Sequence, residues 1–313
     1  MIRLIIPLIV LCVLGSVAAV GFGFLGRIHP AFDTFAHFRM HFAVCLIFAF
    51  FILIFSRFKW IALLGLLVGA YGIYQSQIGY AWSAVTNNKI DGQAEYSMLH
   101  LNLLWTHENP EPVVKWVQEQ DADLLSFAEL SNVWEPHVVQ LHETWPYILH
   151  CPEHGKRGGV RIYSKWPMDF DSQYCGVYGT FGKVQVTTPA NDVFTVGSLH
   201  LRWPWPASGP KQLNSLVPNV EKLEKDALIA GDFNATPWSQ TVQKFARVGA
   251  LQVVPGIGPS WLFQEIPSWV TQVIGLPIDQ VLHKGRLHIL SAEKLENVGC
   301  DHFPILVRFQ IAP

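Results

Sequence analysis

The chain has 313 residues and a formal net charge of −2, but its charges are unevenly distributed. Residues 1–90 contain six Lys or Arg and one anion, Asp33, whereas the rest contains 16 Lys or Arg and 23 Asp or Glu. This contrast excludes a single soluble domain of uniform composition. It predicts a membrane region (residues 1–85), a linker (residues 86–95) and a soluble domain (residues 96–313) that is net acidic.

Three apolar segments predict transmembrane helices. The first, Leu4 to Leu25, is an uncharged run of 22 residues, and a helix of that length crosses a hydrocarbon core of about 30 Å. The other two cover about residues 40–55 and 61–78. A cleaved signal peptide is the alternative for the first run, but its length and the apolar sequence after it favour a span.

Three spans place the soluble domain on the opposite side of the membrane from the N-terminus. The flanking Lys and Arg residues are balanced, three on each side, so the positive-inside rule gives little preference. Arg3, Arg57 and Lys59 lie in very short flanks directly beside the spans. Their position favours an N-terminus inside the cytoplasm and a domain outside it.

The five cysteines are too few and too scattered to predict a disulfide framework. Cys12 and Cys45 lie in predicted spans, which leaves Cys151, Cys175 and Cys300 in the domain. A bond between Cys151 and Cys175 stays open for an oxidising compartment.

From Tyr96 onward, short apolar runs alternate with helical patterns, which is typical of an α/β domain. Asn109 and Pro110 open a helix between the first two predicted strands, and Gly249 is suited to end the last predicted helix. The predicted strands cover residues 97–104, 123–130, 159–164, 184–187, 193–200, 227–232, 278–282 and 305–310, and further helices lie around residues 134–143, 211–222 and 239–248. Many strands and few long helices indicate more than one sheet.

Eight polar residues lie at or just beyond the ends of these strands, where functional sites are often built. Any one of them is more often a solvated residue at the rim of a sheet, so the argument depends on their occurrence together. They are Asn102, Glu129, His200, Asp232, Asn234, Asp279, Asp301 and His302.

Two local patterns stand out within this set. In AGDFNATPW, residues 230–238, a strand ends in a tight turn that presents Asp232 and Asn234 together. The alternative is an Asx-turn in which both side chains bond only local backbone. In LPIDQVL and CDHFP, Asp279 and His302 are able to form an oriented carboxylate–imidazole pair.

The order of these motifs resembles that of the endonuclease/exonuclease/phosphatase family, which has the deoxyribonuclease-I-like fold. LHLNL, with Asn102, resembles the Asn of the family's first strand, and SFAEL, with Glu129, resembles its metal-binding Glu. The other matching segments are GGVRIYSKWP (residues 158–167), SLHL with His200, GDFNATP with Asp232 and Asn234, IDQVL with Asp279, and CDHFP with Asp301 and His302. The resemblance extends over about residues 96–311, and Gln280 and Cys300 depart from the commoner residues.

The resemblance implies a four-layer α/β/β/α sandwich, here preceded by about three transmembrane helices. It also implies an Mg²⁺-dependent phosphoric ester hydrolase, with Mn²⁺ as an acceptable substitute. Glu129, Asn102 and Asp301 would bind the metal ion. The remaining residues would form the catalytic set, in which Asp279 orients His302, Asp232 acts on the attacking water, and His200 and Asn234 contact the phosphate.

The substrate class stays open between a lipid headgroup, a nucleotide and a nucleic acid. A nuclease is the first alternative, but the domain is net acidic and has a single basic cluster, formed by His154, Lys156, Arg157, Arg161 and Lys165. Arg202, Trp203 and Trp205, in the segment RWPWP, are candidate substrate-binding residues that would stack on bases or lie at a membrane interface.

An alternative of another class is a catalytically inactive binding or scaffold module on the same fold. The complete polar set argues against it, because a decayed enzyme would be expected to lack residues such as Glu129 or His302. The predicted partners are a phosphoester substrate and the lipid bilayer, and no protein partner is predicted.

Overall fold

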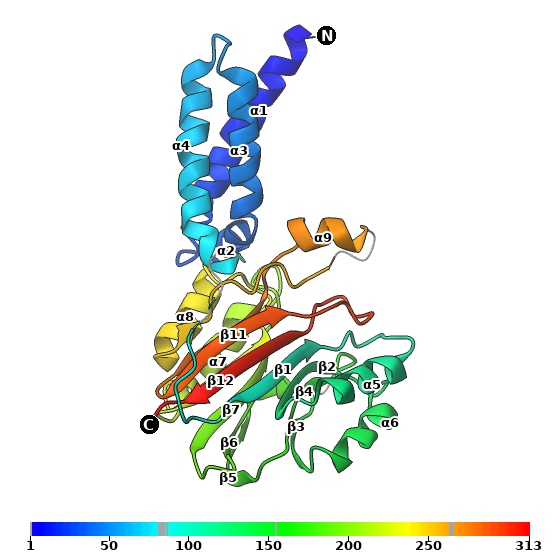
Figure 1. The fold of residues 1–313 in the computed structure, drawn as a ribbon. Coiled ribbons are helices and arrows are strands. Elements are labelled where there is room, and N and C mark those ends of the chain that lie inside the picture. Colours follow the sequence, from blue (N-terminus) through cyan, green and yellow to red (C-terminus); the bar gives the residue numbers. More distant parts are fainter. Residues whose placement is uncertain (1, 81–84, 86, 154, 263–265) are drawn as a thin grey trace.

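A computed structural model of the chain describes residues 2–80, 85, 87–153, 155–262 and 266–313. Its N-terminal quarter is a bundle of three helices, α1 (Ile2–Phe22), α3 (Arg39–Leu53) and α4 (Lys59–Ser76). The short helix α2 (Pro30–His37) connects α1 to α3. Figure 1 shows the bundle standing on the α/β domain, with α2 at its base and the N-terminus at its far end.

The bundle is apolar on its outside as well as inside. Leu11, Phe48 and Phe55 are 65%, 67% and 96% exposed, whereas Leu46 and Leu53 are buried in the bundle's core. A helix of a soluble protein places polar residues at its exposed positions, so this pattern is typical of helices that face lipid.

Length and composition indicate two spans, α1 and α4. The third predicted span is not confirmed, because α3 has only 15 residues. It passes the same criteria only together with α2, from which it is bent by 56°. The bend begins directly after His37, where the chain turns from the base of the bundle upward.

Helices α3 and α4 pack closely because small residues line their contact. A Cβ atom at Gly69 would lie 2.9 Å from the carbonyl oxygen of Ala43, and Gly72 also faces Ala43, whereas Gly65 faces Leu46 of α3 and Val13 of α1. Small residues that let two backbones approach are common where helices pack in membranes.

The α/β domain contains two six-stranded sheets with mixed strand directions. In spatial order, the first sheet consists of β11 (Leu287–Lys294), β12 (Ile305–Ile311), β1 (Tyr96–Asn102), β2 (Leu124–Leu130), β4 (Gly159–Ser164) and β3 (Tyr147–Cys151). The second consists of β5 (Met168–Cys175), β6 (Phe181–Thr187), β7 (Val193–His200), β8 (Ala227–Asp232), β10 (Asp279–Lys284) and β9 (Gln252–Val253).

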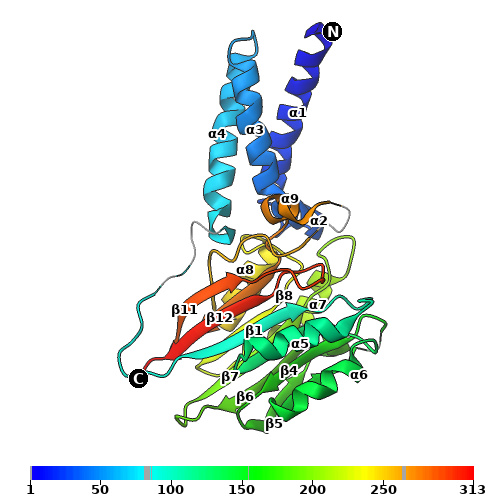
Figure 2. The same ribbon diagram turned by 45° about the vertical axis from the view of Figure 1, so that its right-hand side comes forward.

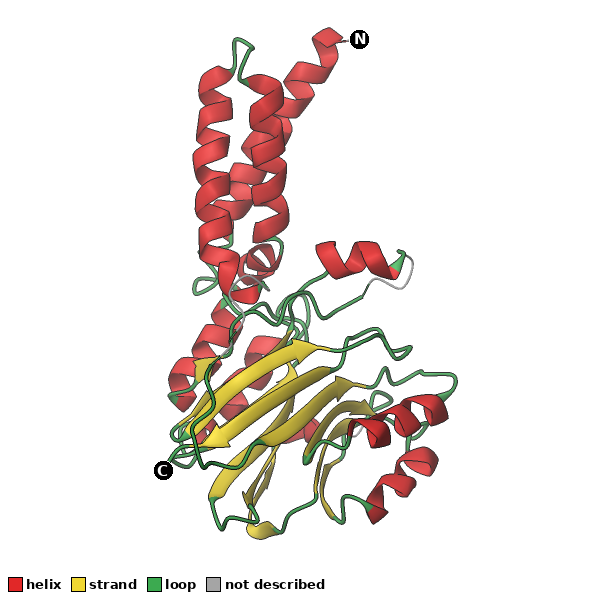
Figure 3. Ribbon diagram, in the orientation of Figure 1, coloured by secondary structure: helices red, strands yellow, loops and turns green. Residues whose placement is uncertain are grey.

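The two sheets pack face to face around one apolar core that includes Met98, Ile162, Val196 and Leu228. A second core lies under α5 (Pro110–Gln120) and α6 (Glu135–Val138), and a third under α7 (Gly209–Val220) and α8 (Gln240–Gly249). The central strands are therefore buried on both faces, which explains their continuous apolar runs. Figure 3 shows helices on both outer sides of the strands, as the predicted sandwich requires.

Several predicted elements have the observed bounds, namely the strands at residues 159–164, 193–200 and 227–232. The helix predicted around residues 134–143 is instead α6 followed by the 3-10 helix Val139–Glu143. Gly249 is the last residue of α8, but the left-handed conformation falls on Ala250, with φ 51°.

Helix α2 was not predicted, and in the α/β domain β3, β5, β9, β11 and α9 (Ser268–Ile274) were not predicted either. β5 shows why, because five of its eight residues are exposed and its pairing with β6 is shifted between Asp169 and Tyr174. Such a strand has no apolar run to mark it.

The predicted linker begins at residue 86, which lies outside the described residues, and its remainder packs on the first sheet. The amide of Asn87 donates to the carbonyl of Leu290, and the amide of Ile90 donates to the side chain of Gln310. The chain leaving the bundle is thus held along β11 and β12.

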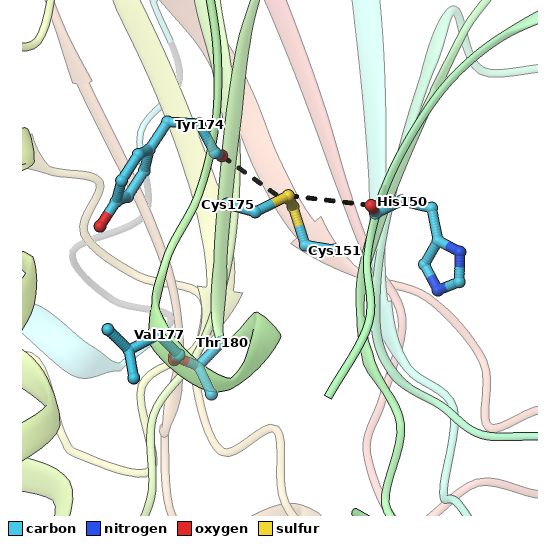
Figure 4. The surroundings of a disulfide bond; sticks show 6 residues. All are labelled: His150, Cys151, Tyr174, Cys175, Val177 and Thr180. Carbon is cyan, nitrogen blue, oxygen red and sulfur yellow. Dashed lines mark hydrogen bonds between the residues drawn. A yellow bond between two sulfur atoms is a disulfide. The ribbon is translucent and has the colours of Figure 1, made fainter. Parts of the chain in front are cut away.

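A disulfide joins the edge strands of the two sheets. Cys151 ends β3, Cys175 ends β5, and their Cα atoms are 5.3 Å apart. β3 and β5 are edge strands of different sheets, so the bond ties the sandwich together at one side (Figure 4). Cys12, Cys45 and Cys300 are free.

Candidate active site

The fold brings all eight predicted polar residues to one edge of the sandwich. β7 and β8 are parallel, and their last residues, His200 and Asp232, are direct neighbours across the ladder. Asp232 is in turn paired with Asp279 on β10. In the facing sheet the parallel strands β1 and β2 end at one edge. Contacts of Asn102 with Asp232 and of Glu129 with His200 place that edge beside β7 and β8.

Asp232 lies at the centre of the site and is 1% exposed. Its Oδ2 accepts hydrogen bonds from the amide groups of Asn102 (3.1 Å) and Asn234 (2.9 Å). Nε2 of His200 lies 3.7 Å and Nε2 of His302 lies 3.9 Å from the same oxygen. The backbone amide of Asn234 donates to Oδ1, so the Asx-turn expected as an alternative forms part of the site itself.

His302 is held by a buried carboxylate. Its Nδ1 lies 2.7 Å from Oδ2 of Asp279, and Nε2 of His100 lies 3.3 Å from Oδ1. Burial opposes the charge on the imidazole, but the carboxylates of Asp279 and Asp232 outweigh it and raise the pKa of His302 to about 10. With this pKa the imidazole is a cation at neutral pH, and its Nδ1 contact with Asp279 orients the ring.

Glu129 reaches the site through an irregularity in β2. Its φ is 58°, and the pairing of β2 with β4 is shifted between Phe127 and Leu130. A left-handed conformation is strained for a residue with a side chain, and such strain is often found at functional positions. Oε2 of Glu129 accepts from the amide of Trp105 at 3.1 Å, and Oε1 lies 3.5 Å from Nε2 of His200.

The donor set fits a hard divalent cation. Oδ1 of Asp301 is buried and has no hydrogen-bond partner among the described residues. Burial raises the pKa of Asp301, and burial together with the neighbouring carboxylates raises that of Asp232. A cation would relieve both effects, because it stabilises the ionised carboxylates.

Two groups of residues offer ligands for such an ion, one that includes Asp279 and one that includes Asp301. Asp232, Asp279 and His302 offer donor atoms within 4.8 Å of one another. However, both oxygens of Asp279 already face histidines, whereas Oδ1 of Asp301 has no hydrogen-bond partner in the described part of the chain.

A cavity of about 360 Å³ opens over these groups. Its polar side is lined by Glu129, Asp232, Asn234, Asp301 and His302. Its apolar side is lined by Phe38, Leu104, Trp105, Trp203, Trp261 and Ile278. Phe38 joins α2 to α3, so the N-terminal helical bundle itself forms part of the wall.

A second cavity of about 540 Å³ adjoins the first and shares Trp105, Arg157, Trp203 and Asn234 with it. It is also lined by Lys156 and by Arg202, whose guanidinium lies 3.2 Å from the carboxylate of Glu153. Trp205 lines neither cavity, and its carbonyl instead faces the hydroxyl of Thr34.

The predicted basic cluster does not form one surface. Arg161 is buried and pairs with Glu135, and Lys165 pairs with Asp121. His154 lies outside the described residues, and Lys156 and Arg157 remain near the site.

Three residues of the site, His100, Trp105 and Phe38, were not predicted from the sequence. His100 could have been found, because it lies two residues before Asn102 on β1 and therefore on the same face of the strand. Nothing local marks Phe38, which reaches the site only through the docking of the bundle on the domain.

Comparison with protein-family models gives a match to the "Endonuclease/Exonuclease/phosphatase family" over residues 99–302. Comparison with curated protein sequences gives no match. Among solved structures, ANGEL2, a 2',3'-cyclic phosphatase, superposes with a TM-score of 0.57 at 13% identity, over 72% of this chain and 98% of that one.

The human Nocturnin catalytic domain with bound sulfate gives a TM-score of 0.55 at 13% identity, over 71% of this chain and 96% of that one. A beta toxin mutant from Staphylococcus aureus with bound magnesium ions gives 0.54 at 12% identity, over 70% of this chain and 100% of that one. At these identities the structural likeness shows the fold, while the family match extends over most of the domain. The chain belongs to the endonuclease/exonuclease/phosphatase family.

Proposed function

We propose that this chain is a membrane-anchored, metal-dependent phosphoesterase that hydrolyses a phosphodiester or phosphomonoester by attack of a water molecule. The observation that carries the proposal is the environment of Asp232, a buried carboxylate in contact with Asn102, Asn234, His200 and His302. Two imidazoles and several carboxylates around one cavity are suited to binding and cleaving a phosphoester.

Glu129, Asn102 and Asp301 would bind the ion, which we take to be Mg²⁺, with Mn²⁺ as a substitute. The unpartnered oxygen of Asp301 supports this assignment, as do the magnesium ions bound in the beta toxin structure of the same fold. Bound there, the ion would neutralise charge on the phosphoryl oxygens.

The chain's own residues account for the rest of the chemistry. Asp232 accepts a hydrogen bond from the attacking water and orients it, and the water oxygen forms a bond to phosphorus while the ester P–O bond breaks. His302, a cation held by Asp279, donates from Nε2 to a phosphoryl oxygen. The proton released by the water leaves with the alcohol product or to solvent.

His200 and Asn234 would have supporting roles. Burial lowers the pKa of His200 to about 4, so its ring is neutral and lies between Glu129 and Asp232. The amide group of Asn234 donates to both Asp232 and the carbonyl of Leu201. This geometry favours a role for Asn234 in orienting Asp232, in place of direct contact with the phosphate.

The anchor and the disulfide support a location at the membrane, with the domain outside the cytoplasm. α1, α4 and the bent pair of α2 and α3 would make three spans, so that the N-terminus and the domain lie on opposite sides. A disulfide persists in an oxidising compartment, and Cys151 and Cys175 are bonded here. A reporter fused to the C-terminus tests the orientation, because a cytoplasmic signal would contradict it.

The activity is tested with the full chain purified in detergent and a panel of DNA, RNA, phospholipids, sphingolipids and inositol phosphates. Each substrate is incubated with Mg²⁺ and with excess chelator, and the Asp232→Asn variant serves as the inactive control. We expect metal-dependent release of phosphate or phosphoester product that the variant lacks. Failure on every substrate, with metal loading confirmed, would contradict the proposal and favour a scaffold role.

A further inference from the structure

Residues 266–275, which include α9 (Ser268–Ile274), project from the edge of the site. At their base, the amide of Leu262 donates to the carbonyl of Asp301, and the amides of Ser260 and Trp261 donate to the carbonyl of Leu276. Both ends of the projection are therefore joined to each other and to the loop that carries Asp301 and His302.

The outer surface of α9 is apolar and exposed. Trp269 is 72%, Val273 73% and Ile274 39% exposed. Trp269 and Val273 are four residues apart and so lie on one face of the helix. The sequence contains no charged residue from position 266 to 278. An exposed apolar patch of this kind marks a surface that binds a partner or a membrane.

The position of α9 identifies its partner as the bilayer. Nε2 of His41, in the first turn of α3, lies 2.6 Å from the carbonyl of Ile274. Figures 1 and 2 show α9 beside the base of the bundle and across the direction of its helices. An 18-residue helix such as α4 is about 27 Å long, close to the hydrocarbon thickness of about 30 Å. The base of the bundle, with α9 beside it, would thus lie at the headgroup level.

The reaction cavity opens at this same level. Phe38, one residue before α3, and Trp261, at the base of the projection, both line it together with Asp232 and His302. A phosphoester in the headgroup layer would therefore meet the polar groups of the cavity, while its apolar part stays against Phe38 and α9.

We propose that α9 inserts into the boundary between headgroups and acyl chains of the bilayer that holds the bundle, and that the substrate is a lipid phosphoester presented there. The inference rests on the proposed function, whose substrate class it names. Trp side chains are enriched at the membrane–water interface, where their rings lie at the headgroup level.

Insertion is tested by fluorescence quenching in phosphatidylcholine vesicles that contain brominated phosphatidylcholine. The signal of Trp269 is the difference between the full chain and its Trp269→Phe variant, and Trp116→Phe, on α5, gives the matched control. We expect the bromine atoms to reduce the Trp269 signal at least twofold and to leave the Trp116 signal unchanged. Equal quenching of the two would overturn the insertion.

The substrate class is tested in proteoliposomes that contain phosphatidylethanolamine, phosphatidylglycerol and sphingomyelin, with bis(p-nitrophenyl) phosphate as the soluble diester. We expect Val273→Asp to lower the ratio of lipid to soluble turnover at least tenfold. Val139→Asp, at a residue 58% exposed that directly follows α6, at the end of the domain away from the bundle (Figure 1), should leave the ratio unchanged. Hydrolysis of the soluble diester with no lipid turnover would overturn the inference alone. No turnover of either would contradict the proposed function as well.

Discussion

Asp33 in α2 accepts hydrogen bonds from both the backbone amide (3.1 Å) and the hydroxyl (2.8 Å) of Thr241 in α8. Its other oxygen accepts from the amide of Gln240 at 2.7 Å. The single anion among the first 90 residues thus lies at the N-terminus of α8, where negative charge is favourable. Trp238 adds a bond from its indole to the carbonyl of Ala36 at 2.6 Å. The N-terminal helical bundle is therefore docked on the α/β domain by specific contacts.

Replacing this carboxylate should loosen the docking. We expect Asp33→Ala to lower the free energy of unfolding by about 2 kcal/mol, the range for losing charged hydrogen bonds to buried amides. The melting temperature in detergent should fall by roughly 4–8 °C. Asp91→Ala, at an exposed linker residue, is the control and should change little. Equal melting temperatures of the two variants would show that the docking contributes nothing to stability.

Hydrolysis should depend on a divalent metal ion that Glu129 helps to bind. We expect excess chelator to abolish hydrolysis and Glu129→Gln to lower turnover at least about a hundredfold, the usual scale for a lost electrostatic group. Titration calorimetry with Mn²⁺ should show weaker binding to Glu129→Gln than to the parent chain. Glu143→Gln, at an exposed position, should bind Mn²⁺ normally. Unchanged affinity in Glu129→Gln would remove this residue from the ligand set.

The pair of Asp279 and His302 should matter for turnover more than for folding. Asp279→Asn keeps the shape but replaces the charge that faces Nδ1 of His302. We expect turnover to fall by at least about a hundredfold, with circular dichroism and the melting profile retaining a folded domain. His302→Ala should give a similar loss, and the double variant should not be much worse, because the two residues act as a unit. Additive losses would mean that they act independently.

The disulfide should stabilise the sandwich. Cys151 and Cys175 are separated by 24 residues, and closing a loop of that length is worth about 3 kcal/mol in the chain-entropy model. We expect Cys151→Ser with Cys175→Ser to lower the denaturant midpoint accordingly. Thiol labelling of the unfolded parent chain without reductant should detect three cysteines. Detection of five would contradict the bond.

Lys294 should make stability depend on pH. Burial lowers its pKa from 10.5 to about 8, although its ammonium donates to the carbonyl of Pro259. Between these values the unfolded chain binds the proton and the folded chain does not, so the free energy of unfolding rises with pH. Compared with Lys294→Met, the parent chain should therefore gain stability from pH 8 to pH 10.5 in urea titrations. A constant difference between the two proteins would contradict the shift.

The sequence by itself predicted the family and the set of eight polar residues that the structure brings to one edge of the sandwich. Each of these depends on local pattern, such as GDFNATP directly after an apolar run, or on the order of motifs along the chain. Strands β4, β7 and β8 were predicted with their observed bounds because both faces are buried, which leaves short apolar runs with clear ends.

The tertiary structure alone decided how distant segments meet. Asp33 contacts Thr241 across 208 residues, and Phe38 reaches a cavity formed by residues up to position 302. Cys151 and Cys175 are joined because β3 and β5 are edge strands of different sheets, and neither strand was predicted. α9 is short and apolar without a polar face to mark it, so its place beside α3 follows from the fold. Local patterns report which residues are buried, whereas these contacts depend on how the sheets and the bundle pack.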